Sequence, residues 1–219
     1  MSVSAQDRTS VPLLTETETP PAPAAATPLA GNPGMVGIPT VIAGAIGLGL
    51  VNIGFVPATT SGAGMPIIIM ATAIGLLITT IWAAALGQNA SASLFAVFFG
   101  FYGSYAALLL GLIHGWYGIP ASQVARTTEF WIICWFATIV LLTLTTMRLP
   151  WSFTLLLGLV DLALVFLYLG VSTANTTWTR VGGVIVFAFV AVAVYLFIDI
   201  MDSETGGKGL PLGKPIIGG

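Results

Sequence analysis

One carboxylate, Asp161, lies in the middle of a long apolar stretch, within the sequence Gly-Leu-Val-Asp-Leu. An ionised carboxylate is costly in hydrocarbon, so this group is expected to be protonated, to accept hydrogen bonds or to face water. Two roles are open for it. It could respond to protons beside a path for a solute, or it could form a structural hydrogen bond to a neighbouring helix.

Uncharged donors are the other groups that could handle a solute in these apolar stretches. Asn52, Thr80, Tyr102 and Ser104 could each donate a hydrogen bond to an anion without placing a fixed charge in a membrane. Bonding between helices is the alternative role for each of them. No Lys or Arg lies in the middle of an apolar stretch. An anion that crosses would therefore be held by hydrogen bonds and helix dipoles, or would cross as the neutral acid.

Asn32 and Pro33 stand directly before the first apolar stretch. Asn is a favoured N-cap residue and Pro suits the first helical position, so this pair predicts the start of a helix. It could serve only as that start. Alternatively, the positive end of the helix carries free amides that could attract a carboxylate at the entrance of a path.

Residues suited to catalysis or metal binding are scarce. The chain has one His and one Cys, so we expect no metal or other cofactor bound by such residues. His114 and Asp161 belong to different apolar stretches, and no second acid lies at mid-stretch to pair with Asp161. We therefore expect that the protein is not an enzyme.

The composition indicates where these side chains must lie. Of 219 residues, 57% are hydrophobic and 6% are charged, and the mean hydropathy is +1.01. Soluble domains carry about a quarter charged residues, so this chain could not cover a soluble surface and must present its outer face to lipid. The net charge of −2 provides no basic field for nucleic acid.

Six apolar stretches are long enough to cross a bilayer, which takes about 20 residues. They lie at about 36–56, 65–86, 93–115, 129–147, 151–172 and 181–200. Pro, Gly and Asn punctuate the breaks between them. The predicted fold class is therefore all-α: a polytopic membrane protein whose six transmembrane helices form one compact bundle over residues 32–202.

The two ends of the chain differ from this bundle. Residues 1–31 are rich in Ser, Thr, Pro and Ala, which predicts a disordered tail, and residues 203–219 are expected to form a Gly-rich C-terminal tail. An even number of spans places both termini on one side. If that side is cytoplasmic, it holds four of the six Lys and Arg residues, as the positive-inside rule favours. We expect an integral protein of the cell membrane with both termini in the cytoplasm.

Five short motifs follow one another in the order in which a known family carries them. They are Asn32-Pro33-Gly34-Met35-Val36-Gly37-Ile38, Asn52-Ile53-Gly54-Phe55, Tyr102-Gly103-Ser104-Tyr105, Val160-Asp161-Leu162 and Leu210-Pro211-Leu212-Gly213. In turn they resemble the Asn-Pro-Ala-Pro-Leu-Gly-Leu, Asn-x-Gly-aromatic, Tyr-Gly-Ser-aromatic, Leu-Asp-Leu and Leu-Pro-x-Gly motifs of the acetate uptake transporter family. This family is also called the succinate–acetate permease family.

The resemblance implies a six-helix subunit, a hexameric ring and a separate pathway through each subunit. It implies transport of acetate, succinate or similar small carboxylates, either through a channel or by proton-coupled uptake. It also implies an apolar constriction at Val41, Tyr102 and Val160. Only the tyrosine is retained, because the family usually has Phe and Leu at the two positions that are valine here. The side chains of this constriction are therefore smaller than usual, and a wider opening is expected.

Two other functions remain open at the level of sequence. The altered constriction could belong to a channel for another small solute, such as ammonium. The predicted disordered tail is also compatible with a membrane subunit that acts in signalling or as a scaffold without transporting anything.

Overall fold

The computed structural model describes residues 30–218, and within them the regular secondary structure is helical apart from an isolated β-bridge. Six helical stretches in this part of the chain are long and apolar enough to cross a membrane. The predicted fold class, an all-α polytopic membrane protein with six spans, is confirmed. The predicted disordered tail falls almost entirely on residues 1–29, which lie outside the described residues.

The helices are α1 (Gly34–Asn52), α2 (Ile74–Ala85), α3 (Asn89–His114), α4 (Val124–Thr146), α5 (Trp151–Ser172) and α6 (Thr176–Glu204). The second span is composite, because a 3₁₀ segment, η1 (Ala58–Gly64), and a π-helical segment, η2 (Ile67–Ala73), precede α2. A short 3₁₀ turn, η3 (Ala121–Gln123), leads into α4.

The ends of some helices differ from the apolar stretches. Helix α1 ends at Asn52, although the apolar residues continue to 56, because Gly54 adopts a left-handed backbone conformation with φ of +85°. Helix α6 continues to Glu204 beyond the apolar residues. The length of an apolar stretch reflects the thickness of the bilayer, whereas the bounds of a helix are set by where the backbone leaves the helical conformation.

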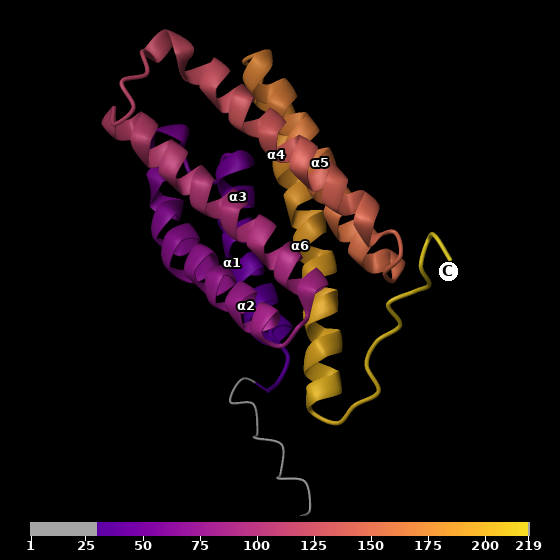
Figure 1. Cartoon of the computed structure of the whole chain (residues 1–219). Coiled ribbons are helices and arrows are strands. Elements are labelled where there is room, and N and C mark those ends of the chain that lie inside the picture. The colour runs from indigo at the N-terminus through magenta and orange to yellow at the C-terminus, as the bar shows by residue number, and fades with distance from the viewer. Residues whose placement is uncertain (1–29, 219) are drawn as a thin grey trace, which may run out of the picture.

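Successive spans alternate in direction, so α1 begins and α6 ends at the same end of the bundle (Figure 1). We call this the termini end, and the opposite end the distal end. Helix α6 packs against α1 and α5, α5 packs against α4, and α2 with η2 packs against α1 and α3. The backbones of α3 and α4 meet over a short stretch only. Side chains therefore fill much of the space between these two helices.

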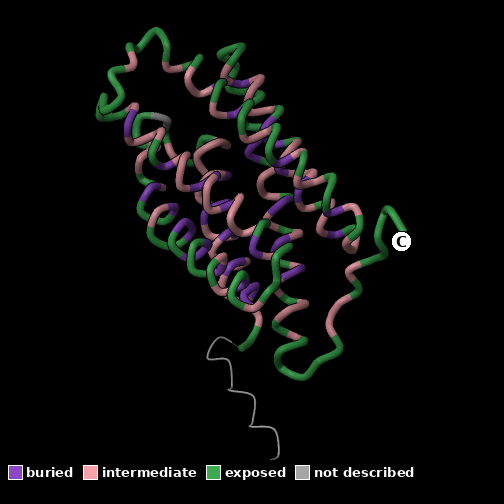
Figure 2. The backbone as a smooth tube through the Cα atoms, viewed as in Figure 1, coloured by how far each residue is buried: buried purple, intermediate pink, exposed green. Residues whose placement is uncertain are grey.

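Buried residues lie along the interior of the bundle, and exposed residues cover its outside (Figure 2). Many of the exposed side chains are large and apolar, including Met70, Ile81, Phe130, Leu141 and Val184, which are each at least 60% exposed. An apolar outer surface is what hydrocarbon requires of a spanning protein. The chain is thus an integral membrane protein.

Glycines bring α1 close to its neighbours. A Cβ added at Gly44 would lie 2.5 Å from Thr72 Oγ1 on η2 and 3.0 Å from the ring of Tyr102 on α3. The Thr72 hydroxyl also donates to the Thr40 carbonyl of α1, at 2.9 Å. Gly47 differs, since a Cβ there would have no atom within 4 Å. Close packing of α1 therefore depends on some of its glycines and not on others.

The C-terminal tail follows a defined course from α6 back to the turn between α4 and α5 (Figure 1). We call residues 207–217 the C-terminal strap. On α6, the Tyr195 hydroxyl donates to the Pro211 carbonyl, and the carboxylates of Asp199 and Asp202 accept from Leu210 N and Gly209 N, all within 2.7–2.9 Å. At the α4–α5 turn, Ile216 N and Ile217 N donate to the Met147 carbonyl at 3.0 Å. Residues that composition describes only as Gly-rich are thus hydrogen-bonded at both ends of the strap.

Candidate functional site

Three cavities follow one another through the bundle between α1, α3, α4, α5 and α6. The central cavity, of about 80 Å³, is lined by side chains that include Asn52, Tyr102, Tyr105, Trp131 and Val160. The termini-end cavity, of about 70 Å³, is lined by side chains that include Val41, Phe95, Thr146, Phe153 and Leu196. The distal cavity, of about 190 Å³, is lined by side chains that include Leu109, Leu112, Thr128, Val171 and Thr179. The central and termini-end cavities are therefore the two smaller cavities of the row.

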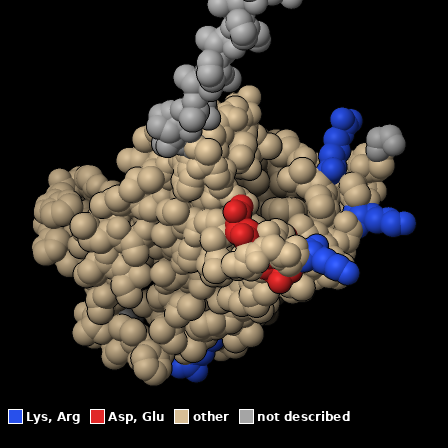
Figure 3. Space-filling model, turned by 90° about the horizontal axis from the view of Figure 1, so that it is seen from below, with Lys and Arg blue, Asp and Glu red and all other residues tan. Residues whose placement is uncertain are grey.

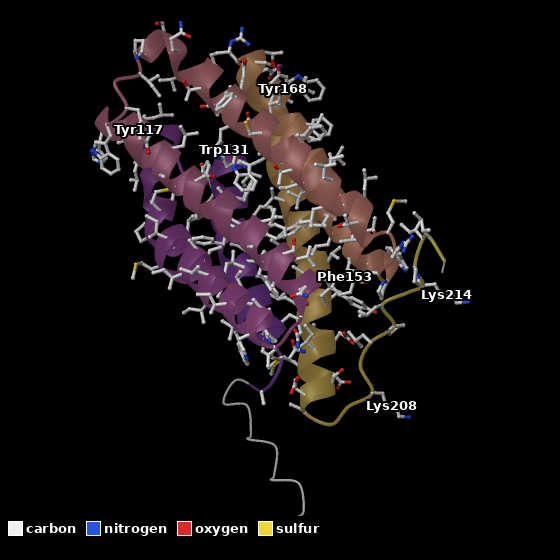
Figure 4. All side chains as sticks on the ribbon, viewed as in Figure 1. Tyr117, Trp131, Phe153, Tyr168, Lys208 and Lys214 are labelled. Atoms are coloured by element: carbon white, nitrogen blue, oxygen red, sulfur yellow. The ribbon has the colours of Figure 1, made fainter. Side chains whose placement is uncertain are left out.

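Neighbouring cavities share lining residues, which shows that they are adjacent. The central and distal cavities share Asn52, Tyr105, Trp131 and Leu167. In Figure 4, Trp131 lies in the distal half of the bundle and Phe153 lies nearer the termini end. The row thus runs along the helices, in the direction in which a solute would cross the bilayer.

No charged side chain is among the described residues that line these three cavities. The walls are apolar apart from a few hydroxyl, amide and indole groups, which agrees with the absence of Lys and Arg from the middle of each span. A site of this kind can hold a solute by hydrogen bonds but offers no fixed counter-charge to an anion.

The three residues of the expected constriction are all buried: Val41, Tyr102 and Val160 are 6%, 3% and 9% exposed. Tyr102 and Val160 line the central cavity, whereas Val41 lines the termini-end cavity. The Tyr102 ring makes an edge-to-face contact with Phe101, with 5.3 Å between the ring centroids. The structure thus brings these residues to adjacent cavities rather than to a single ring.

Asn52 is the last residue of α1, and its side chain lines both the central and the distal cavity. Gly183 of α6 allows this placement, because a Cβ there would lie 2.9 Å from Asn52 Cβ. Of the uncharged donors singled out in the sequence, Asn52 and Tyr102 are therefore the two that face the row of cavities.

Ser104 lines none of the three cavities and lies behind the residues that do. Its Oγ accepts hydrogen bonds from Trp131 Nε1 and from Trp135 Nε1, each at 2.9 Å, and donates to the Phe101 carbonyl at 3.2 Å. These bonds join α3 to α4 where the two backbones lie apart. We call Ser104, Trp131 and Trp135 the indole clasp. Ser104 thereby positions Trp131, which lines two of the cavities.

Asn32 and Thr80 do not line any of the three cavities. Asn32 Oδ1 accepts from Gly34 N at 3.0 Å, so its side chain caps the start of α1. The Thr80 hydroxyl donates to the Leu76 carbonyl of its own helix at 2.8 Å. Helix α2 packs on the outer side of α1 and α3, and for that reason it brings no side chain to the row.

Asp161 faces α4 and does not line the cavities. Thr143 Oγ1 lies 2.7 Å from Asp161 Oδ2 and 2.9 Å from the Ile139 carbonyl oxygen. The Thr143 hydroxyl donates to Asp161 Oδ2, and its single proton is shared with the Ile139 carbonyl. Asp161 Oδ1 is buried and has no hydrogen-bond partner among the described residues. Asp161 thus accepts one hydrogen bond from α4, and its second oxygen is left without a partner within residues 30–218, which is costly for a buried polar atom.

Phe98 and Phe189 line both the central and the termini-end cavity and are not among the sequence candidates. Phe98 precedes Tyr102 by four residues and so lies on the same face of α3. That spacing was a usable signal for Phe98. Nothing comparable marked Phe189, because α6 is apolar on every side.

The family of the chain is shown by a match over most of its length. A family model described as the GPR1/FUN34/yaaH family matches residues 15–206. The chain belongs to the GPR1/FUN34/yaaH family. This confirms the resemblance that the ordered motifs predicted.

The solved structure of the bacterial acetate channel SatP is similar to this member of the GPR1/FUN34/yaaH family. It aligns over 84% of this chain and 99% of that chain, with a TM-score of 0.75 and 19% sequence identity. At this identity the likeness establishes a shared fold. No curated protein matches the chain. Among residues 30–218, no group of three or more His, Cys, Asp or Glu side chains could hold a metal ion.

Proposed function

We propose that this protein forms a transmembrane pathway for acetate and similar small carboxylates. The observation that carries this proposal is the row of three cavities along the bundle, with uncharged walls and with the side chains of Asn52 and Tyr102 facing it. Family membership and the fold shared with a bacterial acetate channel support it. The protein is then a channel or transporter and not an enzyme.

Different side chains would have different roles in the passage of a carboxylate. Asn52 and Tyr102 would donate hydrogen bonds to the carboxylate in the central cavity, which both of them line. Val160 in the central cavity and Val41 in the termini-end cavity would add apolar wall to two successive parts of the row and disfavour an ionised solute. Asn32 would fix the start of α1, whose free amides face the termini end of the bundle. A weakly held anion or a neutral acid suits these walls better than a tightly bound ion.

Proton coupling would involve Asp161 rather than a residue in the wall. Asp161 adjoins Val160, which lines the central cavity, and it contacts Thr143 of α4. A change in its protonation would reverse the direction of the Thr143 hydrogen bond and thereby alter how α5 packs on α4. Passive permeation needs no such change, so the two mechanisms predict different behaviour for Asp161→Asn.

We also propose a hexameric assembly in the cell membrane with both termini in the cytoplasm. Lys208 and Lys214 lie at the termini end (Figure 4), as does Arg148 in the turn between α4 and α5. Arg126 and Arg180 lie near the starts of α4 and α6, at the distal end. The excess is small, but its sign follows the positive-inside rule. Acidic side chains from the end of α6 gather on the same face, with Lys and Arg nearer its margin (Figure 3).

The test is uptake of radiolabelled acetate into proteoliposomes at pH 5 and pH 7.5, with empty liposomes and a collapsed proton gradient as controls. We expect protein-dependent uptake that Tyr102→Ala reduces or makes less selective. Loss of uptake when the gradient collapses, together with loss in Asp161→Asn, would establish proton coupling. Folded protein that gives no uptake above empty liposomes would refute the proposal.

Another small solute, such as ammonium, is the second candidate. The observation that favours it is the pair of small side chains, Val41 and Val160, which line the two smaller cavities of the row. A competition panel would separate the two candidates, because a carboxylate pathway is blocked by other short carboxylates and not by ammonium.

A further inference from the structure

We propose that Phe98 and Phe189 form an aromatic partition between the central and termini-end cavities and set the size of solute that passes. This inference rests on the proposed transport function and adds to it two residues that determine selectivity. It concerns this chain in particular, because valine stands at two of the three constriction positions.

The two rings are the only side chains among the described residues that line both the central and the termini-end cavity. Phe98 comes from α3 and Phe189 from α6. Their ring centroids are 6.1 Å apart and their planes are inclined by 38°. The partition therefore consists of two contacting rings contributed by two helices.

Burial and packing hold both rings in place. Phe98 is 6% exposed and Phe189 is 3% exposed. On its other side Phe98 stacks against Tyr102, with 6.5 Å between the ring centroids. A solute that leaves the hydroxyl of Tyr102 thus meets these rings before it reaches Val41. Since both rings are apolar and in contact, water is excluded from the boundary, and the passage opens only when a ring rotates or moves.

The partition accounts for a feature that the constriction residues leave unexplained. Val41 and Val160 line different cavities, so two small side chains do not close one section of the path. Removing the partition, by contrast, would join the central and termini-end cavities directly. Size selection in this chain therefore falls on the rings of Phe98 and Phe189.

The experiment compares wild type with Phe98→Ala, Phe189→Ala and the milder Phe98→Leu in proteoliposomes. Two quantities are measured: the ratio of butyrate to acetate uptake, and osmotic water permeability by stopped-flow light scattering. Butyrate has the same charge as acetate and a longer apolar tail. The matched control is Phe99→Ala, because Phe99 neighbours Phe98 on α3, is partly buried and lines none of the three cavities.

We expect each partition variant to raise the butyrate-to-acetate ratio by about tenfold or more, because one methylene group is discriminated by about that factor in an apolar site and butyrate is two methylene groups longer. Water permeability should rise in the same variants, and Phe99→Ala should behave as wild type. A structural role alone would lower thermal stability without moving either quantity.

The outcomes separate this inference from the proposed function. Unchanged water permeability and unchanged selectivity in folded variants would overturn the partition, whatever wild type does with acetate. Raised water permeability in the variants of a wild type that takes up no carboxylate would retain the partition and refute the carboxylate pathway.

Discussion

Replacing Ser104 with Ala should loosen the contact between α3 and α4. In the indole clasp the Ser104 hydroxyl accepts two hydrogen bonds, from Trp131 and Trp135, each 2.9 Å long. A hydrogen bond between membrane helices contributes about 0.6 kcal/mol on average and up to about 2 kcal/mol. Two lost bonds, with two partly buried indole N–H groups left without an acceptor, are expected to lower the free energy of unfolding by about 1–3 kcal/mol.

The assay is reversible unfolding in mixed micelles, followed by circular dichroism, with Thr80→Ala as the matched control. Thr80 bonds only to a carbonyl of its own helix, so its loss should change the free energy of unfolding by less than about 0.5 kcal/mol. Combining Ser104→Ala with Trp135→Phe should cost less than the sum of the two single changes, because both remove the same bond.

Two results would refute this reasoning. A Ser104→Ala protein as stable as the Thr80→Ala protein would show that the clasp contributes nothing between α3 and α4. Strict additivity with Trp135→Phe would show that the serine and the indole act independently of each other. The same Ser104→Ala protein should also take up acetate more slowly, because Trp131 lines the central and distal cavities.

The remaining predictions concern backbone approach and the C-terminal strap. Gly44→Ala should lower the thermal stability in detergent, by about 1–3 kcal/mol in unfolding free energy, because the new methyl group would lie 2.5 Å from Thr72 Oγ1. Gly47→Ala should be neutral, since nothing lies within 4 Å of its Cβ position. Asp202→Asn should speed tryptic cleavage within the strap, because the ionised acceptor of Gly209 N–H is replaced by a weaker one.

The strap prediction has an internal control in Glu204→Gln. Glu204 ends α6 close to the same segment but accepts no described hydrogen bond from it, so this change should leave cleavage after Lys208 at the wild-type rate. Equal cleavage rates for Asp202→Asn and Glu204→Gln would show that the carboxylate does not hold the strap. For Gly44→Ala, a stability equal to that of Gly47→Ala would contradict the close approach of α1 to η2.

The sequence alone determined the class of fold and the family. With so few charges and six long apolar stretches, a lipid-facing helical bundle was the arrangement in which every backbone amide could be satisfied. The ordered motifs from Asn32 to Gly213 then indicated the family that the comparison confirmed. Asn52 and Tyr102, chosen because they are uncharged donors within apolar spans, do lie on the row of cavities.

Which face of each helix points into the bundle was decided only by the tertiary structure. Thr80 and Ser104 are as polar as the donors that line the cavities, yet one bonds within α2 and the other holds two indoles behind the wall. Phe98 and Phe189 are indistinguishable by type from phenylalanines that face lipid. In a soluble protein the apolar stripe of a helix identifies its buried face, whereas a helix in contact with hydrocarbon is apolar on both faces. The inward direction is therefore decided by close packing between helices, which no single span encodes by itself.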